Sequence, residues 1–218
     1  MNNTYLYHHG IKNQKWGVRR YQNPDGTLTA EGRKRYGNDI TIAKGSEIHR
    51  IIPKDWAEKE KTYTGHAYAS FIKEDTDRYK QFAKMFGQQS SDMTFKTMNI
   101  LKSPSMKRRV DEFVTLMNTN EKARSAMIKS SRGLFNYIPK KYFDKLDNDK
   151  TAEKVYQKFA YLLVCKPDLR DPYFKQLSEA GYNMIIDDAD VRGGISKQPI
   201  IVFERQKMLE LQSIKDIE

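Results

Sequence analysis

The chain has 218 residues, with 39 Lys and Arg against 28 Asp and Glu, so its formal net charge is +11 at pH 7. Aromatic residues make up 11% of it, which supports a folded core and excludes a wholly disordered polyelectrolyte. The single cysteine, Cys165, excludes an internal disulfide framework, and we expect it to be buried packing. No stretch approaches the roughly 18 apolar residues of a membrane helix, and no signal-peptide pattern opens the sequence, so we expect a soluble protein without a membrane partner.

Residues 1–37 are predicted to form a basic, turn-rich N-terminal arm. The first 36 residues carry seven basic and two acidic side chains, a net of +5, whereas the other 182 residues carry a net of +6. Asn23-Pro24-Asp25-Gly26 is a turn signal, and Thr29 is typical of the N-cap of a short helix that ends before Gly37. Basic residues interleaved with aromatics suit an acidic protein surface or nucleic acid. A protein partner is the favoured interpretation, and a merely solvated arm and a nucleic-acid-binding arm are the alternatives.

A folded domain is predicted over residues 38–218. Apolar alternation bounded by Gly and Pro predicts short strands at 40–42, 47–52, 66–71, 183–187 and 199–204. Helical spacing and capping residues predict five helices, at 75–86, after Ser103-Pro104, from Asn120 to near Gly133, from Asp149 or Thr151, and from Asp171-Pro172 to Gly181. The fold class is therefore α+β: a small split or mixed sheet of N- and C-terminal strands with a large helical insertion at about 75–181.

Few motifs in the sequence carry chemistry. The adjacent His8 and His9 cannot share one face of an element, so no metal site is predicted there. The acidic cluster at 187–190 resembles a calcium loop but lacks its terminal Glu, since Gln198 stands in that position, and a solvated loop over 187–197 is expected. No Walker loop, GxSxG elbow or HExxH is present.

One set of polar residues on the predicted strands suggests a site. Arg50 beside His49, Tyr68 with Ser70, and Glu204 lie on three strand-like segments that could converge. An Arg, a Ser and a Glu together suit the ribose and nicotinamide end of NAD, where the Glu would stabilise the positive charge that develops as the glycosidic bond breaks. The alternative is structural: Arg50 and Glu204 pair at a sheet end, and Ser70 faces solvent.

Residues 8–37, HHGIKNQKWGVRRYQNPDGTLTAEGRKRYG, resemble a segment found in proteins of phages and prophages of Firmicutes-type bacteria. That segment reads HHGIKGxKWGVRRxQNxDGTLTxxGxxRY, and Asn13 stands where the family has Gly. In the family it is attached to structural and head-associated proteins and to domains of unknown function. The resemblance implies a virion-docking role for residues His8, His9, Lys15, Trp16, Arg19, Arg20 and Tyr21.

The stretches KGSEIHRI, GHAYASFIKEDTDRYKQF and AGYNMIIDDADVRGGISKQPIIVFE resemble the split-sheet fold of ADP-ribosyltransferases. That family has Arg or His on a first strand, Ser-x-Ser or Tyr on a second, and Glu on a later one. The resemblance implies that Arg50, Tyr68, Ser70 and Glu204 are catalytic and that His49, Arg50 and Ser70 contact NAD as a substrate. One Ser replaces the Ser-Thr-Ser run, and Val202 interrupts the Glu-x-Glu pattern. A degenerate, non-catalytic scaffold is therefore an alternative to a catalytic domain.

Three functions follow as hypotheses. The first is a phage or prophage virion-associated protein with a basic docking segment and a degenerate ADP-ribosyltransferase-like domain, located in the virion or the host cytoplasm. The second is an active NAD-dependent ADP-ribosyltransferase that modifies a host protein. The third is a nucleic-acid-binding accessory protein, for which a basic face continuing over Lys107, Arg108 and Arg109 would be needed.

Overall fold

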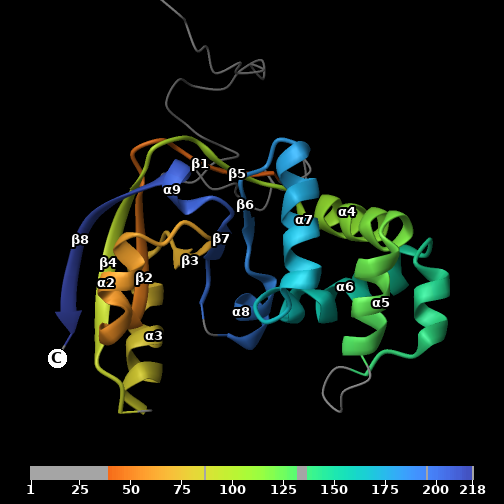
Figure 1. Ribbon diagram of the computed structural model, residues 1–218, viewed down its shortest axis with the longest axis horizontal. Coiled ribbons are helices and arrows are strands. Elements are labelled where there is room, and N and C mark those ends of the chain that lie inside the picture. Colours follow the sequence, from red (N-terminus) through yellow and green to blue (C-terminus); the bar gives the residue numbers. More distant parts are fainter. Residues whose placement is uncertain (1–38, 86, 132–136, 195, 218) are drawn as a thin grey trace, which may run out of the picture.

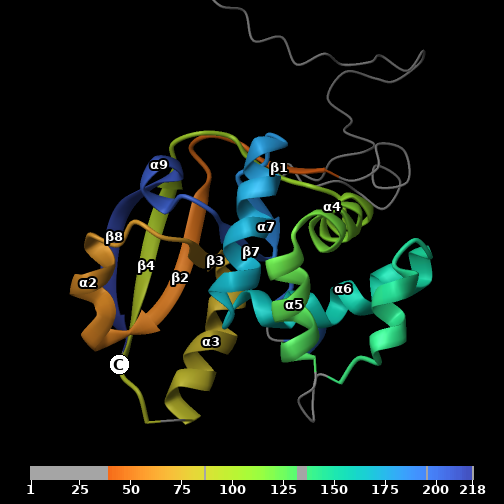
Figure 2. The same cartoon turned by 45° about the vertical axis from the view of Figure 1, so that its right-hand side comes forward.

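The computed structural model describes residues 39–85, 87–131, 137–194 and 196–217. Over these residues the fold is α+β, as the sequence predicts. Figures 1 and 2 both show strands β2, β4 and β8 at one end of the molecule and helices α4 to α7 at the other. The N-terminal arm, its short helix and its proposed docking residues lie outside the described residues.

A six-stranded sheet has the order β6-β7-β3-β2-β4-β8, and every neighbouring pair in it is antiparallel. Its strands are Met184–Ile186 (β6), Pro199–Val202 (β7), Ala67–Ser70 (β3), Glu47–Pro53 (β2), Ser90–Thr97 (β4) and Leu209–Ile217 (β8). A separate two-stranded sheet pairs β1 (Ile40–Ile42) with β5 (Leu101–Ser103). The sheet therefore combines strands from both ends of the folded domain.

The helices α4 to α7 form a layer of their own beside the sheet (Figure 1). They span Met106–Thr119 (α4), Glu121–Ser130 (α5), Asp149–Leu163 (α6) and Pro167–Glu179 (α7), with the 3-10 helix η2 at Lys140–Lys145. Asn120 and Asn148 are N-caps whose side chains accept hydrogen bonds from Ala123 N and Thr151 N, as short polar residues do at helix starts. The remaining helices are η1 (Lys54–Trp56), α2 (Ala57–Lys61), α3 (Lys73–Met85), α8 (Asp188–Gly193) and α9 (Arg205–Met208).

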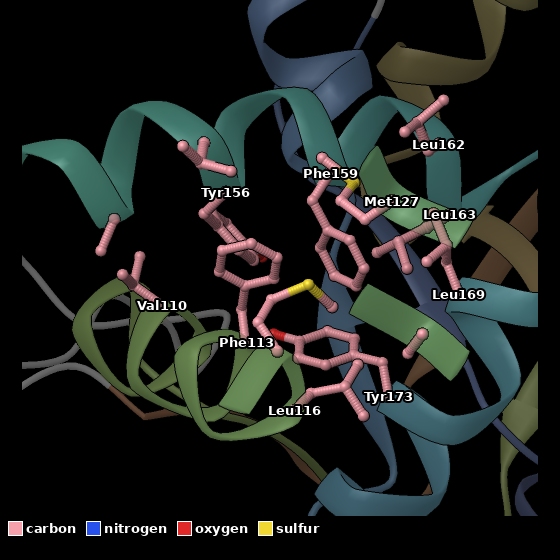
Figure 3. Close-up of a cluster of buried hydrophobic side chains, with 14 of the residues drawn as sticks. Val110, Phe113, Leu116, Met127, Tyr156, Phe159, Leu162, Leu163, Leu169 and Tyr173 are labelled. Carbon is pink, nitrogen blue, oxygen red and sulfur yellow. The ribbon is translucent and has the colours of Figure 1, made fainter. Parts of the chain in front are cut away.

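Two hydrophobic clusters lie on opposite faces of the sheet. The first fills the helical layer, where the rings of Phe113 and Phe159 lie 4.7 Å apart and those of Phe159 and Tyr173 lie 5.0 Å apart (Figure 3). It reaches the sheet through Ile185 and Ile201. The second cluster lies on the other face and includes Ile48, Ile52, Ala67, Ala69, Met93, Phe95, Met184, Ile200 and Val202.

Several elements differ from those predicted by sequence. The strands β4 and β5 interrupt the range assigned to the helical insertion, and β8 was not predicted. Helix α7 begins at Pro167, so Pro172 lies inside it rather than at its start. The predicted loop after Asp187 contains α8.

Cys165 is exposed, so the expectation that it is buried was wrong. It lies in the short connection between the end of α6 at Leu163 and the start of α7 at Pro167. Among the described residues, no helix is both long enough and apolar enough to span a bilayer.

Candidate functional site

A cavity of about 230 Å³ opens beside the sheet where β2 and β3 lie next to α3 and α8. Its polar and aromatic lining includes His49, Arg50, Trp56, Tyr68, Ser70, Tyr79, Asp187 and Asp190. The strand register explains how His49 and Ser70 come together, because they pair with each other across β2 and β3. Tyr68 lies two residues before Ser70 on the same strand, so Tyr68 and Ser70 share a face. Four of the five site residues expected on the strands therefore reach one cavity.

His49 is buried, with 5% of its surface exposed. Its Nε2 atom lies 3.1 Å from Glu47 Oε1, whereas its Nδ1 atom has no hydrogen-bond partner among the described residues. A buried ring nitrogen without a partner costs free energy, and native proteins keep few of them. The Nδ1 atom is therefore an unused hydrogen-bonding group in a residue that lines the cavity.

Tyr68 offers a second unpartnered polar atom. Its hydroxyl is buried and has no hydrogen-bond partner among the described residues. Burial raises the pKa of Tyr68, and nearby Arg170 opposes that rise without making a hydrogen bond of normal geometry. The hydroxyl therefore stays protonated at neutral pH and can donate to a ligand.

Ser70 is fully engaged in holding the chain. Its Oγ atom donates to Asp75 Oδ2 over 3.0 Å and accepts from Ile72 N over 3.2 Å. Asp75 also accepts from Ser196 Oγ at 2.6 Å and from the backbone nitrogens of Lys197 and Gln198. Burial opposes ionisation of Asp75, but these hydrogen bonds outweigh it and lower its pKa. Ser70 thus fixes the loop before β7, and the alternative that it faces solvent was wrong.

Arg50 contributes differently from the way predicted. Adjacent residues on a strand point to opposite faces, so its side chain is directed away from that of His49. Its guanidinium lies 2.5 Å from Glu60 Oε2 on α2, and Arg205 contacts the same carboxylate. The alternative pairing of Arg50 with Glu204 is therefore wrong, because Glu60 is the partner.

Glu204 does not reach the cavity. It precedes α9, its side chain is 49% exposed, and it pairs with Lys207 at 2.7 Å. Ser70 is opposite Pro199, at the far end of β7, and β7 alone separates the two sites by roughly 10 Å at about 3.3 Å per residue. The structure therefore does not bring Glu204 together with His49, Tyr68 and Ser70.

Two carboxylates that were not predicted to be site residues, Asp187 and Asp190, line the cavity instead. Asp187 caps α8 by accepting from Ala189 N and Asp190 N, and Asp190 accepts from the Tyr79 hydroxyl. Burial, followed by repulsion from Asp190, raises the pKa of Asp187 to about 7. Burial and the bond to Asp190 also raise the pKa of Tyr79.

The acidic cluster does not form a cation loop. Asp188 points away into the helical layer, where it pairs with Arg109 at 3.0 Å and accepts from Tyr156. No three His, Cys, Asp or Glu side chains within the described residues are arranged to hold a metal ion. The expectation of a solvated loop was also wrong, because Asp187 and Asp188 are buried.

Comparison of the chain with protein-family models, with curated proteins and with solved structures gave no match. The structure alone therefore defines its class, which is an α+β domain with a polar cavity on an antiparallel sheet.

Proposed function

We propose that the chain is a phage or prophage virion-associated protein whose N-terminal arm docks it to a protein partner and whose folded domain binds NAD. The docking part is supported by the phage-type segment at residues 8–37 and its basic charge. The binding part is supported by one observation: His49 Nδ1 and Tyr68 OH, on neighbouring strands, are both buried and unpartnered beside one cavity.

The size and lining of the cavity suit one end of a dinucleotide. Whole-ligand pockets measure roughly 300–1,000 Å³, so about 230 Å³ accommodates a nicotinamide and its ribose rather than all of NAD. The two unpartnered atoms supply hydrogen bonds to ribose hydroxyls or to the carboxamide. Trp56, on the lining and 52% exposed, offers a ring face at the opening.

The proposed domain binds NAD without using Glu204 for catalysis. In the ADP-ribosyltransferase family that the sequence resembles, the Glu on the later strand stabilises the positive charge that develops on the reacting ribose. That role requires the carboxylate to lie beside the bound ligand, whereas Glu204 is exposed and paired with Lys207. We therefore favour a degenerate ADP-ribosyltransferase-like module.

Calorimetric titration of the full chain with NAD tests the binding. We expect Tyr68→Phe, which keeps the ring and removes the hydroxyl, to weaken binding about fivefold to tenfold, equivalent to about 1 kcal/mol. Glu204→Gln is the matched control outside the cavity and should leave the Kd unchanged. Absence of NAD binding at millimolar concentration would overturn the proposal.

An active transferase is the second candidate, favoured by the carboxylates of Asp187 and Asp190 in the cavity. Nicotinamide release from NAD, measured with and without bacterial lysate, separates it from the first. Release that survives Glu204→Gln but disappears in Asp190→Asn would assign the charge-stabilising role to α8. Release lost in Glu204→Gln would instead support the arrangement that the resemblance implies.

A nucleic-acid function receives less support from the described residues. Lys107 pairs with Asp111 at 3.2 Å and Arg108 with Glu112 at 2.7 Å. Arg109 is buried against Asp188. Arg109 therefore contributes nothing to a basic surface, and Lys107 and Arg108 each lie beside a carboxylate that offsets their charge.

Docking is tested with purified phage particles from a strain that carries the gene. The tagged full chain should copurify with the particles, and the chain that lacks residues 1–37 should not. Equal recovery of both forms would overturn the docking role of the arm.

A further inference from the structure

The cavity contains more negative than positive charge. Asp187 and Asp190 line it from α8, and Arg50 is the only Lys or Arg among its described lining residues. The Arg50 guanidinium is bound to Glu60, which neutralises it. Asp187 accepts from two backbone nitrogens and Asp190 from the Tyr79 hydroxyl, but neither forms an ion pair with a described residue, so no cation from that part of the chain balances their charge.

A buried carboxylate beside a second, half-buried carboxylate is costly. Asp187 is 5% exposed, and its Oδ1 atom accepts from two backbone nitrogens of its own helix. Burial and the neighbouring Asp190 raise the pKa of Asp187 to about 7, so these two hydrogen bonds compensate its ionised form only in part. A cation bound between the carboxylates would relieve both the desolvation and the repulsion.

Aromatic rings surround the same space. Tyr68 on β3, Tyr79 on α3 and Trp56 on η1 all line the cavity. The faces of such rings carry negative potential and attract organic cations, most strongly where water is excluded. Trp56 remains 52% exposed, so its ring face is free to stack on a planar ligand at the opening.

We propose that Asp187 and Asp190, with the surrounding aromatic rings, make the cavity selective for a planar organic cation, so that it takes the positively charged pyridinium of oxidised nicotinamide in preference to a neutral ring. This inference rests on the proposed function, since it concerns the same cavity and names the charge state of the ligand. The two carboxylates act as specificity-determining residues, and no bond is formed or broken.

Titration of the full chain at pH 8.5, above the pKa of Asp187, with NAD+ and with NADH tests the selectivity. The two differ in ring charge, and we expect NAD+ to bind at least tenfold more tightly. The cation 1-methylnicotinamide and neutral nicotinamide form a second pair, in which the same order is expected. The double variant Asp187→Asn, Asp190→Asn should bring each ratio close to one while neutral nicotinamide binds as before.

The controls separate this inference from the proposed function. Glu204→Gln removes a carboxylate outside the cavity and should leave both ratios unchanged, and circular dichroism confirms that the double variant is folded. If NAD+ and NADH bind equally, charge selection is refuted while NAD binding stands. A ratio that persists in the double variant also refutes it. If neither dinucleotide binds, the proposed function fails, and the inference fails with it unless 1-methylnicotinamide alone is bound.

Discussion

At the scale of the single residue, Asp187 couples the cavity to pH. Its pKa is raised from 3.8 to about 7, first by burial and then by Asp190. Between these values the folded state binds a proton that the unfolded state releases, so this group makes the free energy of unfolding fall as pH rises from about 4 to about 7. The site therefore loses stability at the pH where its negative charge becomes available to a ligand.

Asp187→Asn should remove this dependence. Asn is also a good N-cap, so the hydrogen bonds at the start of α8 are kept. Each unit of pKa shift corresponds to about 1.4 kcal/mol, and we expect the variant to be more stable than the parent by about 1–3 kcal/mol at pH 8. The advantage should shrink steadily as the pH is lowered toward 4, as measured by urea unfolding at several pH values.

Asp147→Asn is the control for this prediction, because residue 147 is exposed. It should change the free energy of unfolding by less than about 0.5 kcal/mol at either pH. An advantage of Asp187→Asn that does not vary with pH would contradict the assignment.

Sequence reasoning found part of the candidate site. Period-two alternation identified the strands that carry His49 and Tyr68, and both residues line the cavity. Alternation also places the side chains of Arg50 and His49 on opposite faces of β2. The convergence predicted for their polar groups therefore did not take this alternation into account. Tyr79 and Asp190 come from α3 and α8, which lie more than 100 residues apart in the chain, and their hydrogen bond is a tertiary contact without a local sequence signal.

At the scale of the element, one buried ion pair connects α4 to α8. Arg109 and Asp188 lie 3.0 Å apart, with side chains 6% exposed on both sides. Tyr156 on α6 donates to the second oxygen of Asp188, and Tyr173 on α7 donates to the backbone oxygen of Arg109. The pair therefore fixes α8, and with it the cavity wall, to the helical layer.

Arg109→Met should be strongly destabilising. It leaves the buried Asp188 carboxylate without its cation, which typically costs about 3–5 kcal/mol. The double variant Arg109→Met, Asp188→Asn removes the uncompensated charge and should recover at least about 1 kcal/mol of that loss. Urea unfolding monitored by circular dichroism measures both changes.

The same helix supplies a matched control. Lys107 forms an ion pair with Asp111 at 3.2 Å, and the two side chains are 76% and 49% exposed. Lys107→Met should therefore cost no more than about 1 kcal/mol. Equal losses for Lys107→Met and Arg109→Met would show that burial of the Arg109–Asp188 pair does not matter.

The strands β4 and β8 and the helix α8 were not predicted from the sequence, and their sequence patterns were either weak or assigned to another structure. In β4, apolar Met93 and Phe95 alternate with polar Asp92 and Thr94, a strand pattern that was overlooked inside a region assigned to helices. The strand β8 is an edge strand with polar outward residues, and a bulge opposite Thr94 and Phe95 breaks its alternation. In α8, Asp187 is the N-cap and Gly194, with φ of 66°, ends the helix.

At the scale of the whole molecule, Asp39 is the first residue that the structure describes, and it connects three elements. Its carboxylate accepts from Ser105 N at 3.0 Å and from the Tyr182 hydroxyl at 3.1 Å, so it joins β1 to the starts of α4 and β6. Both described hydrophobic clusters are formed by residues from Ile40 onward. The boundary between arm and domain at residue 37 stays a prediction, which truncation tests.

A chain that starts at residue 39 should fold like the full chain. We expect its free energy of unfolding to stay within about 0.5 kcal/mol of the full-length value, since the described core clusters keep all their members. Its affinity for NAD should also be unchanged, while docking to the virion is lost.

Removing Asp39 as well, or changing Asp39→Ala, should lower the free energy of unfolding by about 1–3 kcal/mol, because Ser105 N and the Tyr182 hydroxyl lose their acceptor. A large loss of stability on removing residues 1–38 alone would mean that the arm is part of the fold, and docking and NAD binding would then have to be treated as properties of one unit.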